Sequence, residues 1–195
     1  MDVFLVSTGT IAIGEIGDKT QLLALLLAAR FRKPLPIVLG IFVATVLNHA
    51  AAAWAGEWVS QAVPQNIMKW GLGLSFIAMA IWALFPDKAD EGTNPIDRFG
   101  AFGATAIAFF LVEIGDKTQL ATAALAAKFH DLVPVVMGTT LGMMLADAPV
   151  VFFGEALARV IPLRVARMIA AGIFFVLGVG ILFDLGQYFG VLMTP

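Results

Sequence analysis

One seven-residue segment occurs twice in this chain, and each copy interrupts a long apolar stretch. The segment Glu-Ile-Gly-Asp-Lys-Thr-Gln occupies residues 15–21 and returns unchanged at residues 113–119. Each copy carries two carboxylates and one ammonium group, and a charge at the centre of a membrane helix costs about 2.5 to 3.5 kcal/mol or more. Because the chain bears this cost twice, we expect the charges to serve a function.

The residues around the two segments are those of a membrane protein. Of the 195 residues, 60% are hydrophobic and only 13% are charged, whereas a soluble domain is about 45–50% apolar. We predict an all-α integral membrane protein with six transmembrane helices, since about 20 apolar residues cross a bilayer. The net charge of −2 gives no support for a nucleic-acid partner. The expected spans are 3–29, 35–58, 66–86, 100–127, 133–155 and 163–186.

The two halves of the chain are copies of each other. Residues 15–64 align with residues 113–162 without a gap, and 20 of these 50 positions are identical. Each copy contains three expected spans, so the second copy must enter the membrane from the opposite side. We therefore predict two inverted three-helix repeats, at 1–86 and 100–195, joined by a linker at 87–99.

The basic residues between the spans predict the orientation in the membrane. Two of them, Lys69 and Lys128, flank the spans on one side. Eight flank the spans on the other side: Arg30, Arg32, Lys33, Lys88, Arg98, Arg159, Arg164 and Arg167. The positive-inside rule places the side with eight in the cytoplasm. Both termini are then expected outside the cytoplasm, and the linker inside it.

The repeated carboxylates are the candidate metal ligands. Glu15 lies about 18 Å into its span at 1.5 Å per residue, close to the middle of a core about 30 Å thick. If the two repeats face each other, Glu15, Asp18, Glu113 and Asp116 converge near the bilayer midplane. Carboxylates suit Ca²⁺ or Mn²⁺, whereas zinc or copper favours the His and Cys that the motif lacks. Four carboxylates and two ammonium groups sum to −2, which one divalent ion neutralises.

The remaining polar residues of the motifs are candidate accessory groups. Protons would compete with the metal for the carboxylate oxygens, and this competition is what a cation/proton exchanger requires. Lys19 and Lys117 would keep the metal-free site near neutrality or tether it. Further oxygens are available from Thr20, Gln21, Thr118 and Gln119.

The relative positions of the motif side chains depend on whether one helix runs through the motif without a break. In a continuous helix Glu15 and Asp18 share a face, and Lys19 adjoins Glu15. Gly14, Gly17 and Gly115 allow another backbone to approach closely or allow the helix to break, and spans of about 27 residues are long for a straight crossing. We therefore expect tilt or interruption of the first and fourth spans.

Two further polar residues lie deep in expected spans. Asp147 in the fifth span aligns with His49 in the second, and this couple could supply a ligand or carry protons. The alternative for both residues is a satisfied position in the core, and Asn48 beside His49 is expected to pack by hydrogen bonding. The motif charges could likewise be interhelical ion pairs that only stabilise the bundle.

The paired motifs resemble those of the cation/proton exchanger family with E-x-G-D-(K/R)-(T/S) segments. This family includes Golgi calcium/manganese transporters, chloroplast manganese transporters and bacterial manganese exporters of the MneA type. The resemblance covers the whole chain and implies export of a divalent cation, mainly manganese or calcium, driven by counter-moving protons. It implies that Glu15, Asp18, Glu113 and Asp116 are the acidic site residues. The bacterial members favour manganese and imply the inner membrane.

Other functions remain open from the residues alone. An exporter of a small organic solute such as an amino acid could have this size, and carboxylate rings also occur in passive cation channels. No Ser/His/Asp or His-rich pattern indicates an enzyme. We expect no cofactor, with Mn²⁺ or Ca²⁺ as the transported substrate. The sequence leaves open the preference between these ions, the proton stoichiometry and the oligomeric state.

Overall fold

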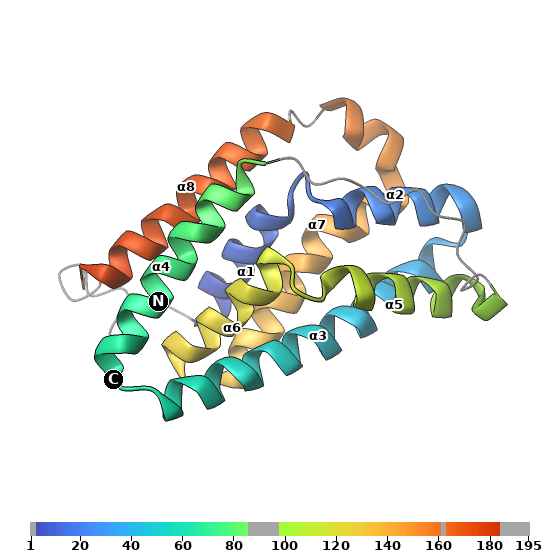
Figure 1. Cartoon of the computed structure of the whole chain (residues 1–195). Helices are drawn as coiled ribbons and strands as arrows, with labels where there is room; N and C mark the ends of the chain where they lie inside the picture. The colour runs from blue at the N-terminus through green and yellow to red at the C-terminus, as the bar shows by residue number, and fades with distance from the viewer. Residues whose placement is uncertain (1–2, 86–97, 161–162, 184–195) are drawn as a thin grey trace.

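The computed structural model describes residues 3–85, 98–160 and 163–183, and these ranges are almost entirely helical. The predicted all-α class is confirmed, with eight helices in the described ranges (Figure 1). Most of the linker predicted at 87–99 lies outside them. The helices are α1 Val3–Glu15, α2 Lys19–Phe31, α3 Pro34–Ala62, α4 Gln65–Ala83, α5 Gly100–Glu113, α6 Lys117–Phe129, α7 Leu132–Val160 and α8 Leu163–Leu182.

The number of helices exceeds the predicted six because two expected spans are interrupted. The stretch 3–29 is divided between α1 and α2, and the stretch 100–127 between α5 and α6. Each interruption contains a glycine at positive φ, Gly17 at 83° and Gly115 at 76°. These dihedral angles are open to glycine and strained for most other residues, so the two glycines fix where the helices stop.

The other four expected spans are single helices with ends shifted by a few residues. Pro149 lies inside α7, and this helix departs from helical dihedral angles at Phe153, four residues further on. The missing N–H of proline and the bulk of its ring disturb the helix near it. The kink therefore occurs in the same helix but one turn after the proline.

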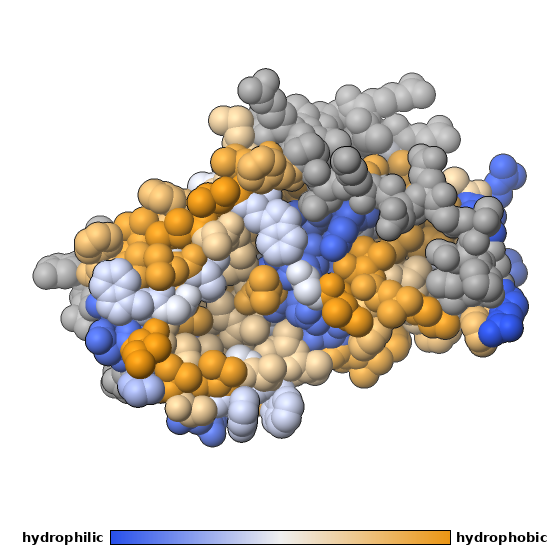
Figure 2. Space-filling model, viewed as in Figure 1, coloured by the Kyte–Doolittle hydropathy of each residue, from blue (hydrophilic) through white to orange (hydrophobic). Residues whose placement is uncertain are grey.

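Within the part of the chain that the structure describes, three helical segments are long and apolar enough to cross a bilayer: Pro34–Ala62, Asn66–Ala83 and Leu132–Gly154. The 13-residue α1 is about 20 Å long at 1.5 Å per residue, shorter than a hydrocarbon core of about 30 Å. Large apolar side chains such as Trp54, Leu35 and Val176 are about two-thirds exposed. Figure 2 shows apolar residues over much of the surface and hydrophilic ones gathered mainly at two ends and in a central strip. This is the surface of a membrane protein.

The two halves of the chain interlock around one another. Helix α1 packs along α7 of the second half, α5 packs along α3 of the first half, and α4 packs beside α8 (Figure 1). Equivalent glycines allow the first two contacts: a methyl group at Gly138 would lie 2.9 Å from Cβ of Ser7, and one at Gly40 would lie 2.8 Å from Cβ of Thr105. The interlocked packing brings the two motifs together inside the bundle.

Candidate metal centre between two broken helices

Each motif forms the junction between two short helices. Glu15 is the last residue of α1, and Asp18 caps the start of α2, where its Oδ1 accepts the Lys19 N–H at 2.7 Å. Glu113 and Asp116 hold the same places at the end of α5 and the start of α6. Carboxylates are favoured at a helix start because free N–H groups and the helix dipole stabilise negative charge there.

Two ion pairs cross from one motif to the other. Lys19 Nζ lies 2.9 Å from Asp116 Oδ1, and Lys117 Nζ lies 2.7 Å from Asp18 Oδ2. The two aspartate side chains are at most 1% exposed. Each lysine thus neutralises the helix-capping carboxylate of the opposite repeat. Because both partners of each pair come from different halves, the pairs also tie the halves together.

Three carboxylates from both halves form one cluster. Glu15, Asp18 and Asp116 are buried, and one oxygen from each lies within 4.8 Å of the other two. Ligands on opposite sides of Ca²⁺, at about 2.3 to 2.6 Å each, are about 4.6 to 5.2 Å apart. The three oxygens are therefore spaced closely enough to bind one divalent cation.

The fourth predicted ligand, Glu113, is placed differently. It is not part of this three-carboxylate cluster, and its Oε2 lies 3.9 Å from Nε2 of His49. Both side chains are fully buried, and neither Glu113 oxygen has a hydrogen-bond partner among the described residues. His49 thus lies beside Glu113 at a distance longer than a hydrogen bond.

Asp147 occupies the position equivalent to His49 in the other half. Its side chain is fully buried, and among the described residues its two oxygens have no hydrogen-bond partner. The backbone carbonyl of the preceding residue, Ala146, accepts from Gln21 Nε2 at 3.0 Å, so Asp147 lies beside the first motif. The predicted couple of Asp147 and His49 therefore borders the centre from opposite repeats, with an acid on one side and an imidazole on the other.

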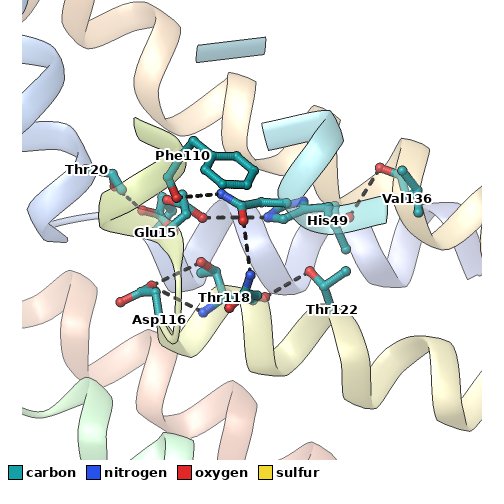
Figure 3. Close-up of polar contacts among 12 residues, drawn as sticks. Glu15, Thr20, His49, Phe110, Asp116, Thr118, Thr122 and Val136 are labelled. Carbon is teal, nitrogen blue, oxygen red and sulfur yellow. Dashed lines mark hydrogen bonds and ion pairs between the residues drawn. The ribbon is translucent and has the colours of Figure 1, made fainter. Parts of the chain in front are cut away.

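The threonines of the motifs contact carboxylates. The Thr20 hydroxyl donates to Glu15 Oε1, and the Thr118 hydroxyl donates to Asp116 Oδ2 at 3.1 Å (Figure 3). The second oxygen of Glu15, Oε2, is buried without a hydrogen-bond partner among the described residues. The threonines therefore orient the carboxylates, and a free oxygen is left at Glu15.

The glutamines of the motifs hold the backbone at the breaks. Gln21 Oε1 accepts the Gly17 N–H at 2.8 Å, and Gln119 Oε1 accepts the Gly115 N–H at 2.7 Å. Their amide oxygens, which the sequence offered as accessory ligands, are thus bonded to backbone. Asn48 was expected to pack by hydrogen bonding, and this is confirmed, since its amide oxygen accepts from Gln119 Nε2 at 3.1 Å. The sequence indicated this hydrogen-bonding role through an amide side chain deep in an apolar span.

Short helices that meet at buried charges inside an apolar bundle define a class of protein: helical membrane transport proteins with discontinuous helices. The family model described as Divalent cation/proton antiporter GDT1 matches residues 3–91 and 101–187. The chain belongs to this family, which confirms the resemblance seen in its motifs. It is a family of transporters and not of enzymes.

Curated relatives cover most of the chain. A protein of Vibrio cholerae named "Putative manganese exporter" is 50% identical over 184 residues, which are 94% of this chain and 92% of the relative. GDT1-like protein 3 of Oryza sativa is 28% identical over 89% of this chain and 71% of its own length. GDT1-like protein 4 is 28% identical over 96% of this chain and 73% of its own length. No solved structure matches the chain.

Proposed function

We propose that this protein exports a divalent cation, with Mn²⁺ favoured and Ca²⁺ possible as a substrate, in exchange for protons. The observation that carries the proposal is the cluster of Glu15, Asp18 and Asp116, in which both repeats contribute buried carboxylates within 4.8 Å of one another. Glu113 completes the proposed ligand set from the neighbouring position beside His49. The family and the name of the Vibrio relative support a manganese substrate.

The proposed exchange follows from competition for the carboxylate oxygens. A divalent ion that enters must displace the ammonium groups of Lys19 and Lys117 from Asp116 and Asp18. It also displaces protons from the glutamates, since a metal ligand must be deprotonated. When the ion leaves, protons and the lysine ammonium groups balance the charge again. Proton movement opposite to the metal is thus built into the site.

The proposed topology has six crossings in the bacterial inner membrane. In this arrangement α1 with α2 forms one crossing, and α5 with α6 forms another, because neither α1 nor α5 is long enough alone. The two repeats at 1–86 and 100–195 have opposite orientations, both termini lie outside the cytoplasm, and the linker at 87–99 lies inside it. The breaks then fall near the bilayer midplane, where a transporter binds its substrate.

The proposed cycle moves the site between two accessible states. The site opens to the cytoplasm and binds the divalent ion as protons leave. One part of the bundle then moves against the other, the site opens to the outside, and the ion is released as protons rebind. The oligomeric state in which this occurs is left open.

The test is flux into and out of liposomes that contain the purified protein. Mn²⁺, Ca²⁺ and internal pH are followed together, with and without an imposed proton gradient. Divalent flux coupled to opposite proton movement supports the proposal and ranks the two ions. Divalent flux without proton movement contradicts exchange and indicates a channel or uniporter. The absence of flux for both ions, with transport of amino acids instead, contradicts the cation substrate.

A further inference from the structure

We propose that Asn48 is a positioning residue that fixes the break between α5 and α6. The break between α1 and α2 is then the movable half of the site. This inference rests on the proposed function, since the placement of a break matters for transport only if the break presents ligands. It assigns different tasks to two motifs whose sequences are identical.

One side chain of α3 is bonded to both sides of the second break. Asn48 Nδ2 donates to the Phe110 carbonyl in the last turn of α5 at 3.0 Å (Figure 3). Asn48 Oδ1 accepts from Gln119 Nε2 at 3.1 Å, and Gln119 Oε1 accepts the Gly115 N–H at 2.7 Å. The chain of hydrogen bonds therefore runs from the end of α5 through α3 to the start of α6.

These hydrogen bonds satisfy backbone groups that the break would otherwise leave without a partner. The last four carbonyls of a helix have no partner within it, and Phe110 is the fourth residue from the end of α5. In an apolar surrounding each unsatisfied backbone group costs several kcal/mol. Loss of the Asn48 amide would thus release the end of α5, which carries Glu113, as well as the α6 start.

The first break lacks the equivalent device. The position equivalent to Asn48 is Ala146, whose methyl group cannot accept or donate a hydrogen bond. Gln21 Nε2 donates instead to the backbone carbonyl of Ala146 at 3.0 Å. This holds the start of α2 to α7, but no side chain at 146 can reach back to Ala12, which is equivalent to Phe110.

Helix α6 also packs more closely against α3 than α2 packs against α7. A methyl group at Gly56 of α3 would lie 2.0 Å from the backbone oxygen of Ala123, so α6 lies directly against α3. At the equivalent Gly154 of α7, a methyl group would lie 2.4 Å from the side chain of Leu25. A flexible side chain thus separates α2 from α7, whereas backbone meets backbone at α6.

The exposure of the two motif lysines agrees with this difference. Lys19 at the start of α2 is 23% exposed, whereas Lys117 at the start of α6 is 4% exposed. The start of α2 is therefore more accessible than that of α6 in this structure. Ile114 and Gly115 in the second break are themselves exposed, so the hydrogen bonds and the helix packing are what indicate that this break is fixed.

The first experiment is hydrogen–deuterium exchange on the purified full-length protein without metal. We expect amides around Gly115 to exchange more slowly than those around Gly17 in the wild type. Asn48→Ala should raise exchange at the second break at least tenfold and leave the first break unchanged. Asn66→Ala, at an exposed position in α4, is the control and should change neither. Equal exchange at the two breaks, or no effect of Asn48→Ala, overturns the proposal.

The second experiment separates positioning from general stability by Mn²⁺ binding. Loss of a buried hydrogen bond leaves its partner group unsatisfied, so we expect Asn48→Ala to weaken Mn²⁺ binding about tenfold. Transport should show the same rise in KM with a smaller change in maximal rate. Unchanged binding with a lowered unfolding temperature would make Asn48 merely structural and overturn the proposal.

Double variants show whether the effect follows the proposed hydrogen-bond chain. The combined loss in Asn48→Ala and Gln119→Ala should be smaller than the sum of the two single losses, because both variants remove the same Asn48–Gln119 hydrogen bond. Asn48→Ala and Gln21→Ala act on separate breaks, and their effects on affinity should multiply. If Asn48→Ala fails to fold, Asn48→Asp keeps the acceptor for Gln119 and removes the donor to Phe110. It should raise exchange at the end of α5, and unchanged exchange there contradicts the proposal.

The two proposals fail in different ways. If the wild type binds neither Mn²⁺ nor Ca²⁺, the proposed function is wrong, while the exchange experiment still decides whether Asn48 fixes the second break. If the wild type binds metal but the breaks exchange equally, the function stands and the role of Asn48 is wrong.

Discussion

Lys19 Nζ lies 2.9 Å from Asp116 Oδ1, an ion pair between the starts of two helices that are 97 positions apart in the sequence. The equivalent ion pair joins the other lysine and aspartate, with Lys117 Nζ 2.7 Å from Asp18 Oδ2. Each repeat therefore supplies the countercharge for the other. Both ion pairs therefore require both copies of the motif.

The two pairs should differ in their contribution to stability. Asp18 is fully buried and its partner Lys117 is 4% exposed, whereas Lys19 is 23% exposed. Removal of one partner from a buried pair costs about 3 to 5 kcal/mol, because a buried charge is left without compensation. We expect Lys117→Ala to lower the unfolding temperature in detergent clearly more than Lys19→Ala. Equal losses would show that the two pairs have the same environment.

The carboxylate cluster should be needed for transport and not for folding. Glu15→Gln and Asp116→Asn keep the size of the side chain and remove one ligand charge, so we expect transport of Mn²⁺ in liposomes to be abolished. The purified variants should still elute as the wild type does in size-exclusion chromatography. Glu57→Gln, whose carboxylate lies outside the cluster, is the control and should transport normally. Wild-type rates in both cluster variants would contradict the proposed site.

The sequence predicted the helical class and indicated where helices could break. Gly17 and Gly115 suggested interruption, and the structure confirms it with positive φ at both. The partners of the lysines could not be predicted. A continuous helix places Lys19 beside Glu15, and the break removes this neighbour relationship. Once the break exists, the pairing of Lys19 depends on the packing of the opposite repeat.

The differences between the two motifs were also beyond prediction from the repeat. Two identical segments predict two identical environments, yet the cluster includes Glu15 and leaves Glu113 beside His49. The long helices also differ, since the second repeat has Asp147 where the first has His49, and His49 Nε2 lies 3.9 Å from Glu113 Oε2. Residues outside the motif therefore make the two halves of the site unequal, and only their packing shows how.

The equivalent glycines Gly56 and Gly154 provide a matched pair for testing this inequality. In Gly56→Ala the new methyl group would meet the backbone of Ala123, which cannot rotate away, whereas in Gly154→Ala it would meet the side chain of Leu25. Overpacking costs about 1 to 3 kcal/mol, so Gly56→Ala should lower the unfolding temperature more than Gly154→Ala. Thermal unfolding of both variants in the same detergent measures this. A larger loss in Gly154→Ala would show that α2, and not α6, is held by close backbone packing.

Metal binding should release protons. A carboxylate that ligates a metal must give up its proton, so the apparent affinity for Mn²⁺ should rise with pH. Calorimetric titrations in buffers with different ionisation enthalpies count the protons released for each bound ion. Glu113→Gln removes one carboxylate outside the three-carboxylate cluster. It should lower the number of protons released for each bound Mn²⁺ while changing the affinity for Mn²⁺ only slightly. Glu15→Gln removes a member of the cluster and should weaken binding more strongly. A larger loss of affinity in Glu113→Gln than in Glu15→Gln would make Glu113 the more important ligand, and an affinity independent of pH would contradict proton exchange at this site.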